Sequence, residues 1–382
     1  MSVPVPVPVL TVTWTEAATV RTARWHSESA APPPARVVVV DDRTTAATAL
    51  RLAREGTGLL WRGDFPGARQ LLAALGRRIA RAAPPAPQDP LQAFRHGRRA
   101  RADRARVLGR LFVLLDAGHS LNLRRAPDVR DACREAYGPA DDTMAVPLTE
   151  LLGVLGAHQW RIKGVEVPAL GARIHPHYGV FAPVRGEYVQ LVAEAPVPGG
   201  CRTAFDLGTG TGVLAAVLAR RGVGRVVATD IGRRALDCAR ANVSRLGLAG
   251  RVDVVGPALY PGHHEGRAEL VVCNPPWLPG SPVSELEYGV YDPDSAMLHA
   301  FLDGLAARLA PGGEGWLVLS DLAERLGLRA PGALPGWITE AGLRVAGRLD
   351  TRPAHPRSRD TADPLHPHRA AEVVSLWRLT AG

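Results

Sequence analysis

Short apolar runs alternate with amphipathic stretches from about Leu170 to the C-terminus, and this alternation restricts the fold more than any other feature. The runs TAFDL, RVVATD, RVDVV and AELVVC have the length of buried strands, while intervening segments such as GVLAAVLARRG have helical periodicity. Strands that alternate with helices form a parallel sheet covered on both faces. The later runs GWLVLS, LRVAGRLD and AEVVSLWRL are further strand candidates. This part of the chain is therefore expected to be α/β.

The first 140 or so residues have a different pattern. Apolar residues three or four apart in TALRLAREGTGLL, ARQLLAALGRRIARA and RARVLGRLFVLLDAG predict helices, separated by proline-bearing loops such as APPAPQDP. The run VVVV at 37–40 fits one buried strand, and the fold of residues 1–45 is left open. We expect a mainly helical domain over residues 1–145 and an α/β domain over residues 146–382.

A glycine-rich loop follows the first strand of the α/β part, which ends in Asp206 and runs into LGTGTG. Glycines allow a sharp turn and close approach to a ligand, and the amides at the start of a helix are ready donors. A dinucleotide fingerprint, GxGxxG, would need a third glycine where Val213 stands. Asp230, at the end of the next strand, can accept hydrogen bonds from a vicinal diol. The pattern predicts a cofactor that contains a nucleoside. The alternatives are another kind of nucleotide ligand or a vestigial loop that binds nothing.

FDLGTGTG resembles the first motif of class I methyltransferases, and TD at 229–230 resembles the acidic end of their second strand. This resemblance implies an enzyme with a Rossmann-like seven-stranded sheet and S-adenosylmethionine as cofactor. It also implies that Asp230 binds the ribose hydroxyls and that Asp206 lies near the methionine part. The acid that often follows the third strand in this family is replaced by Pro257 and Ala258, which leaves the adenine contacts open. The expected cofactor-binding residues are Asp206, Gly208, Thr209, Gly210, Gly212, Asp230 and Ile231.

The segment CNPPWLPG at 273–280 follows the fourth strand, so Asn274 should reach the same sheet edge as the glycine loop. An sp2 amine is a poor nucleophile because its lone pair is delocalised, and binding both of its N–H groups helps to make it pyramidal. The Asn274 side-chain oxygen and the Pro275 carbonyl are two suitable acceptors, and proline fixes the backbone and removes competing donors. Trp277 offers a flat surface for stacking. The alternative is that Asn-Pro-Pro only forms a turn.

NPPW resembles the NPPY/F/W motif of methyltransferases that modify base amines or the side-chain amide of glutamine. HYGVFAPVRGEYVQLV at 177–192 is similar to the segment before the glycine loop in ribosomal RNA guanine-N2 methyltransferases, and more loosely to that of the release-factor glutamine methyltransferases. No second glycine loop precedes it, so residues 1–145 do not clearly match the duplicate domain of the guanine-N2 enzymes. The expected catalytic residues are Asn274, Pro275, Pro276 and Trp277. The expected substrate contacts are His177, Tyr178, Phe181, Tyr288 and Tyr291.

A net charge of +9 and an arginine-rich segment at 94–110 favour a phosphate-bearing partner, although arginine is abundant throughout the chain. The leading expectation is therefore methylation of an exocyclic amine of an RNA base, with RNA or a ribosomal particle as partner and residues 1–145 selecting the substrate. Methylation of a protein glutamine or of a small molecule such as a natural product is the alternative. A further alternative is a module that binds the cofactor without catalysing a reaction.

Compartment and metal content follow from weaker signals. The four cysteines are at least 35 residues apart, which is neither a CxxC pair nor a disulfide framework, and a reducing cytoplasm is expected. No run approaches the ~18 apolar residues of a membrane span, and the start MSVPVPVPVL has no basic region typical of a signal peptide. The paired histidines fit extended loops, and methyl transfer needs no metal, so no metal site is expected.

Overall fold

The computed structural model describes residues 10–354 and 356–382, which form two compact units. The first unit combines the chain up to Ala86 with Arg95–Gln159, and the second combines Pro87–Phe94 with Trp160–Gly382. The expected absence of a signal peptide concerns residues 1–9, which lie outside the described residues. Among the described residues, no helix combines the length and the apolar character that spanning a membrane requires.

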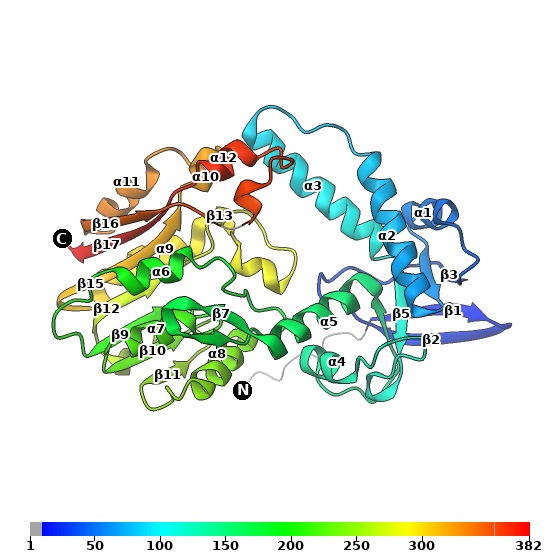
Figure 1. The fold of residues 1–382 in the computed structure, drawn as a ribbon, viewed down its shortest axis with the longest axis horizontal. Helices are drawn as coiled ribbons and strands as arrows, with labels where there is room; N and C mark the ends of the chain where they lie inside the picture. Colours follow the sequence, from blue (N-terminus) through cyan, green and yellow to red (C-terminus); the bar gives the residue numbers. More distant parts are fainter. Residues whose placement is uncertain (1–9, 355) are drawn as a thin grey trace. The chain divides into compact units, whose positions relative to one another are not determined.

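A seven-stranded sheet forms the centre of the second unit (Figure 1), in the order β11-β10-β9-β12-β15-β17-β16. The first five strands in this order are parallel, and β17 is antiparallel to both of its neighbours. The expected seven-stranded Rossmann-like sheet is therefore confirmed. The strands are β9 (Thr203–Leu207), β10 (Arg225–Thr229), β11 (Val252–Val255), β12 (Ala268–Cys273), β15 (Leu309–Ser320), β16 (Leu343–Thr351) and β17 (Val374–Ala381).

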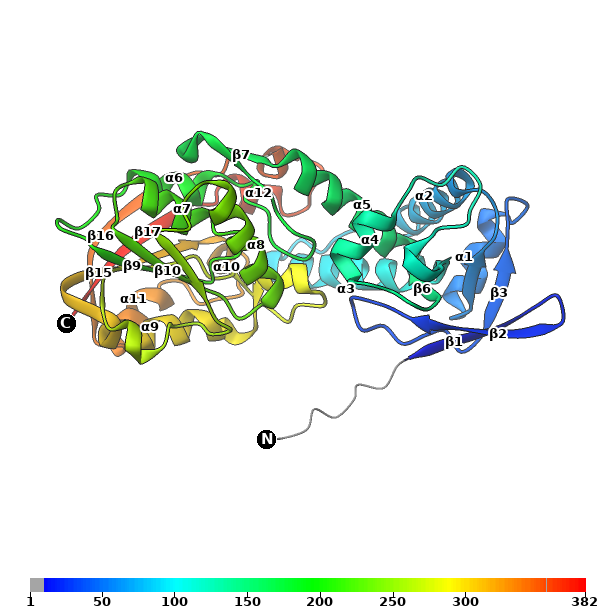
Figure 2. The same cartoon turned by 90° about the horizontal axis from the view of Figure 1, so that it is seen from below.

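Helices cover both faces of this sheet because successive strand side chains point to opposite sides. Ala204 belongs to one apolar cluster and Phe205 to another, and each cluster continues into a different set of helices. Figure 2 shows α6 and α7 on one side of the sheet and α9 and α11 on the other. The helices are α6 (Glu187–Glu194), α7 (Val213–Arg220), α8 (Arg233–Arg245), α9 (Ala296–Arg308), α10 (Leu322–Arg325), α11 (Ala333–Glu340) and α12 (His366–Ala370).

The ends of three neighbouring strands are in register. Leu207, the last residue of β9, pairs with Thr229, the last residue of β10, and with Cys273, the last residue of β12. Each strand therefore leaves the sheet at the same level, and the three residues that follow begin loops at one edge. These residues are Gly208, Asp230 and Asn274.

The first unit contains a six-stranded mixed sheet in the order β1-β2-β6-β5-β4-β3. It is therefore α/β, whereas the sequence predicted a mainly helical domain. The segments GLL and LFVLL were expected in helices, but they lie in the buried strands β4 and β5. The strands are β1 (Thr11–Glu16), β2 (Thr19–Trp25), β3 (Val37–Val40), β4 (Gly58–Trp61), β5 (Leu111–Leu115) and β6 (Met144–Pro147). The helices are α1 (Ala46–Arg54), α2 (Phe65–Arg81), α3 (Pro90–Leu108), α4 (Arg130–Tyr137) and α5 (Leu148–Lys163).

The division between the units differs from the expected boundary at 145/146. It falls between Gln159 and Trp160, within α5, and the segment 87–94 at the start of α3 belongs to the second unit. There, Phe94 is buried and its ring lies 6.5 Å from that of Tyr291, centre to centre. Tyr291 is part of β14 (Tyr291–Asp292), which pairs with β13 (Leu278–Pro279) just after the NPPW segment. The short strands β7 (Val165–Val167) and β8 (Ala172–Ile174) complete the unit.

Candidate functional site

The glycine loop between β9 and α7 adopts a conformation that explains its composition. Gly208, Gly210 and Gly212 have φ values of 69°, 54° and 80°, in the left-handed region that side chains disfavour. At Gly212 a Cβ would lie 3.2 Å from the Cα of Ala239, so α8 approaches the loop closely. The Thr209 N–H donates to the carbonyl of Thr229 at 2.8 Å, which ties the loop to the end of β10. The loop therefore presents backbone to this edge of the sheet.

Asp206 lies beneath this loop and is 1% exposed. Its Oδ2 accepts hydrogen bonds from the Thr209 hydroxyl at 2.6 Å and from the Ala215 N–H at 3.0 Å. The pKa of this carboxyl is raised from 3.8 to about 6, mainly by burial and also by the nearby Asp230, against the lowering effect of the two hydrogen bonds. Both donors are neutral, so a cationic ligand would find an uncompensated carboxylate here.

Asp230 follows β10 directly and is partly buried. Its Oδ2 accepts from the Gly210 N–H at 3.0 Å and its Oδ1 from the Gly232 N–H at 2.8 Å. Burial raises the pKa of this carboxyl, while hydrogen bonds from backbone amides, including that of Ile231, lower it. A carboxylate has about four lone-pair sites and three backbone amides engage this one, so acceptor capacity remains for one ligand hydroxyl. Ile231 itself is 66% exposed and offers an apolar surface beside it.

The NPPW segment begins directly after β12, as the sequence predicted. Asn274 is partly buried, and its Oδ1 accepts a hydrogen bond from the Trp277 Nε1–H at 2.9 Å. Trp277 is also partly buried and packs against the apolar clusters on both faces of the sheet. The Arg185 guanidinium carbon lies over its ring, 5.0 Å from the centre. One face of the indole is therefore covered, and a flat acceptor has at most the other face for stacking. Pro275 is buried and Pro276 is partly buried.

Comparison with protein families identifies this part of the chain. Residues 174–325 match the family model described as the methyltransferase small domain, and the match contains the glycine loop, Asp230 and NPPW. The chain carries a methyltransferase small domain. The predictions of a class I methyltransferase domain and of S-adenosylmethionine as its cofactor are confirmed for this domain.

Relatives resemble the methyltransferase domain over part of their length. A ribosomal protein L11 methyltransferase of Pelotomaculum thermopropionicum is 39% identical over 160 residues, covering 42% of this chain and 43% of the relative. A release factor glutamine methyltransferase of Mycobacterium leprae is 41% identical over 139 residues, covering 32% of this chain and 46% of the relative. The chain therefore spans about half the length of the curated relatives it matches.

Solved structures resemble the chain only weakly. A ribosomal protein L11 methylase from Lactobacillus delbrueckii subsp. bulgaricus aligns with a TM-score of 0.33 and 16% identity, covering 52% of this chain and 80% of the other. A methyltransferase from Thiobacillus denitrificans, solved with S-adenosyl-L-homocysteine, aligns with a TM-score of 0.36 and 17% identity, covering 53% and 92%. At these TM-scores the likeness carries no functional information.

The segment upstream of the glycine loop lies beside the loop that follows NPPW. Tyr178 lies under the guanidinium of Arg234, 5.3 Å from its carbon, and Arg234 pairs with Glu285 at 2.7 Å. A Cβ at Gly289 would lie 2.7 Å from the Cβ of Phe181. The methyltransferase domain thus brings together two segments about 100 residues apart in the sequence. Both contain expected substrate contacts.

The five expected substrate contacts differ in their exposure. Tyr288 is 58% exposed, whereas His177, Tyr178 and Phe181 are partly buried. The His177 N–H donates to the sulfur of Cys238 at 3.3 Å. Tyr291 is 8% exposed and belongs to an apolar cluster, so its ring packs in the interior of the second unit, and the expectation of a place at a pocket rim is wrong.

Two contacts of the glycine loop and the NPPW segment were not indicated by the sequence. The Met297 methyl group lies 2.6 Å from the position a Cβ would take at Gly208, so Met297 forms part of the wall of the loop. The Met297 N–H is held by the carboxylate of Asp292 at 3.0 Å. The other contact is that of Arg185 with Trp277. Arg185 stands in the quoted upstream segment, but nothing in a linear sequence pairs it with an indole 92 residues later.

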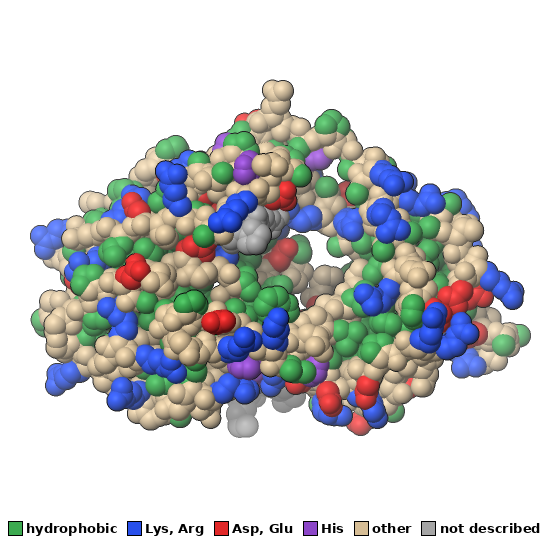
Figure 3. Space-filling view, in the orientation of Figure 1, with side chains coloured by type: hydrophobic (Ala, Val, Ile, Leu, Met, Phe, Trp, Pro, Cys, Tyr) green, Lys and Arg blue, Asp and Glu red, His purple; other side chains and the backbone are tan. Residues whose placement is uncertain are grey.

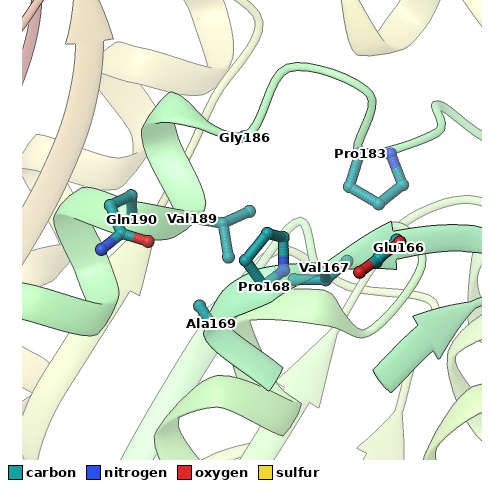
Figure 4. Close-up of a pocket in the computed structure, with 8 residues that line it drawn as sticks. All are labelled: Glu166, Val167, Pro168, Ala169, Pro183, Gly186, Val189 and Gln190. Carbon is teal, nitrogen blue, oxygen red and sulfur yellow. The ribbon is translucent and has the colours of Figure 1, made fainter. Parts of the chain in front are cut away.

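Two other features contain none of the expected site residues. Among the described residues, the side chains of His26, Glu28 and Glu150 in the first unit are the group close enough to share a metal ion, with ligand atoms within 4.8 Å of one another. A small pocket in the second unit contains none of the expected site residues (Figure 4). It is lined by Glu166, Val167, Pro168, Ala169, Pro183, Gly186, Val189 and Gln190.

Proposed function

We propose that this chain is an S-adenosylmethionine-dependent N-methyltransferase that acts on a planar sp2 nitrogen of a macromolecule. The observation that carries the proposal is the common register of three strand ends, which begins the glycine loop, the Asp230 loop and the NPPW segment at one edge of the sheet. A cofactor site and an acceptor site that share this edge can bring a methyl group and a nitrogen together.

The residues present fit the cofactor. Three glycines with positive φ form a cradle in which side chains would be strained. Asp230 retains acceptor capacity for a ribose hydroxyl, and the buried carboxylate of Asp206 has only neutral donors and suits a cationic methionine part. S-adenosylmethionine, when bound, supplies a methyl group from a sulfonium, which is a strong electrophile.

The acceptor nitrogen is oriented by the start of the NPPW segment in this proposal. The amide oxygen of Asn274 has one lone pair engaged by Trp277 and one left for an acceptor N–H. The carbonyl of Pro275 accepts the second N–H, which draws the nitrogen toward a pyramidal shape. Alignment at about 3 to 3.5 Å supplies most of the rate enhancement. The nitrogen loses its proton to water after transfer, when it is cationic, so no dedicated base is required.

Two acceptor classes fit this site. The names of the relatives give protein acceptors, ribosomal protein L11 and release factors, and this supports a side-chain amide of a protein glutamine. An exocyclic amine of an RNA base is supported by the net charge of +9 and by the arginines of α3. On the face drawn in Figure 3, arginine and lysine side chains are spread over both units rather than gathered into one patch. The glutamine is therefore the first candidate and the RNA amine the second.

The unit formed mainly by residues up to 159 has the role of selecting the acceptor in this proposal, because the matched domain covers only residues 174–325.

We place the enzyme in the cytoplasm. All four cysteines are free in the structure, which suits a reducing compartment.

The test is transfer of radiolabel from methyl-labelled S-adenosylmethionine into a lysate of cells that lack this protein. The lysate is then separated into protein, RNA and low-mass fractions. Label in one polypeptide that is released by protease supports the glutamine acceptor, and label released by ribonuclease supports the RNA amine. Label only in the low-mass fraction overturns the macromolecular acceptor. Cofactor binding by calorimetry with no label in any fraction contradicts the enzyme and leaves a cofactor-binding module.

A further inference from the structure

Arg185 lies between the NPPW segment and a buried acid of the same unit. Its Nη2–H donates to both carboxylate oxygens of Glu372, at 3.1 and 3.2 Å. Glu372 is fully buried, at 0% exposure, whereas the Arg185 side chain is 22% exposed. A buried carboxylate needs its cationic partner, so this ion pair fixes the guanidinium firmly.

Ser320 also holds the carboxylate of Glu372 in place. The Ser320 hydroxyl, at the end of β15, donates to Glu372 Oε1 at 2.7 Å and accepts from the Leu322 N–H at 3.0 Å. Glu372 itself lies just before β17, the strand that pairs with β15. The guanidinium is therefore anchored to a buried acid that the last residue of β15 holds in place.

The other side of Arg185 faces the methyl-transfer site. Its guanidinium covers one face of the Trp277 ring, and the Trp277 Nε1–H donates to the Asn274 Oδ1. An indole has a single donor, so the position of the ring decides the direction in which that donor points. The direction of the Trp277 donor in turn decides which lone pair of the Asn274 amide is left for an acceptor.

We propose that Arg185 is a positioning residue for methyl transfer, which acts through Trp277 to orient the carboxamide of Asn274. This inference rests on the proposed function. Arg185 does not contact the reacting atoms in this scheme. Its flat guanidinium holds the indole in place, and Glu372 and Ser320 hold the guanidinium. Lysine could neutralise Glu372 but has no planar group to cover the ring.

The first experiment reads the indole directly and needs no acceptor. Nitrogen-15 labelling of tryptophan gives one N–H signal for each of the eight indoles, and the signal lost in Trp277→Phe identifies Trp277. In Arg185→Lys this signal is expected to shift and to exchange faster with solvent, and Asn274→Ala should move it as well. An unchanged Trp277 signal in a folded Arg185→Lys protein would overturn the proposal.

The second experiment is a double-mutant cycle on the labelled acceptor fraction. Arg185→Lys and Trp277→Phe are each expected to lower kcat about tenfold or more, with the KM for S-adenosylmethionine unchanged. The double variant should be no slower than Trp277→Phe alone, because Arg185 acts through the ring. Losses that multiply, or a wild-type kcat in Arg185→Lys, would refute the inference.

A further variant separates positioning from a simple loss of fold. Arg185→Met combined with Glu372→Gln removes both charges and leaves no buried acid unpaired. The paired variant should fold and bind cofactor, yet keep the low kcat and the altered indole signal; recovery of both to wild-type values would contradict the proposal. If the wild type transfers no label at all, the proposed function fails, and the indole signal still decides whether Arg185 orients Trp277.

Discussion

Individual side chains of the proposed site come from different strand ends. Asp206 and Asp230 accept hydrogen bonds from the glycine loop, and Asn274 follows the end of the neighbouring strand β12. Because the carboxylates and the carboxamide come from different strands, a change in one need not disturb the others. Cofactor affinity and transfer rate can therefore be measured as independent properties.

Asn274→Ala should lower the rate of methyl transfer at least about a hundredfold, because one of two acceptors for the nucleophile is lost. Cofactor affinity measured by calorimetry should change less than about threefold, since the cofactor contacts come from other residues. Gln190→Ala is a matched control, because it removes an exposed carboxamide of the same unit. Wild-type transfer by Asn274→Ala would exclude this side chain from the reaction.

Asp206→Asn should stabilise the fold at neutral pH while weakening cofactor binding. The folded pKa of about 6 lies above the usual 3.8, so the folded protein favours the protonated form. The stability that protonated Asp206 contributes to the fold is complete below pH 3.8 and is lost as the pH rises through 6. Two pH units at ~1.4 kcal/mol each give at most about 3 kcal/mol of gain at pH 7.5.

Urea unfolding of Asp206→Asn and wild type at several pH values checks this effect. The difference in the free energy of unfolding should shrink between pH 7.5 and pH 5, and the Asn oxygen can still accept from Thr209 and Ala215. A variant that is less stable than the wild type at pH 7.5 would show that the charge of Asp206 is compensated in the folded protein.

Elements of the second unit follow from the sequence because strand and helix patterns there are distinct. TAFDL and AELVVC form β9 and β12 without a change of boundary, and the loops that carry chemistry begin where those runs end. The glycine loop was also predictable, because positive φ at three positions in a short turn leaves few other choices of residue.

In the first unit VVVV forms β3 as expected. Other strands of this unit did not follow from the sequence, for two physical reasons. LFVLL is a continuous apolar run that fits a buried strand or a buried helix equally well, and only pairing with β4 and β6 decides. The β1–β2 hairpin turns at Ala17 and Ala18, which have φ values of 49° and 61°. Such turns normally carry Asn-Gly, so Ala-Ala gives no local signal.

Close packing of the glycine loop on α8 can be separated from backbone strain by two variants. Gly212→Ala and Gly222→Ala both place a side chain at positive φ, 80° and 95°. A Cβ at Gly222 meets nothing within 4 Å, whereas at Gly212 it lies 3.2 Å from Ala239. Both should lose about 1 kcal/mol of stability from strain, and Gly212→Ala about 1 kcal/mol more from contact. Equal losses in the free energy of unfolding, measured by chemical denaturation, would show that α8 moves aside for the new methyl group at little cost.

The molecule as a whole combines a domain that comparison identifies with a unit whose role is proposed. The matched domain covers residues 174–325, and the ion pair of Arg185 extends beyond it to Glu372. Contacts such as Arg185 with Glu372 join positions 187 residues apart, and no periodicity in a single sequence reports them. A single sequence also does not report that segment 87–94, which lies before the matched domain, belongs to the second unit.

Phe94→Ala should therefore destabilise the second unit although the residue precedes the methyltransferase domain. Phe94 is 5% exposed, and its removal leaves a cavity beside Tyr291 that costs about 3 to 5 kcal/mol. Hydrogen exchange should accelerate in residues 278–292 and not in β4 of the first unit. Phe94→Leu is the control and should lose much less. Faster exchange confined to the first unit would show that Phe94 packs in the first unit and not in the second.

A crystal structure of this chain with S-adenosylhomocysteine would give the distance from the bound sulfur to Asn274. If the methyl group and the acceptor nitrogen meet at this sheet edge, the bound sulfur should lie within about 8 Å of the Asn274 Oδ1, the sum of a C–S bond, an attack distance and a hydrogen bond. Asp230 should contact the ribose in the same structure. A sulfur more than about 12 Å from Asn274, or separated from it by the apolar core, would contradict the account.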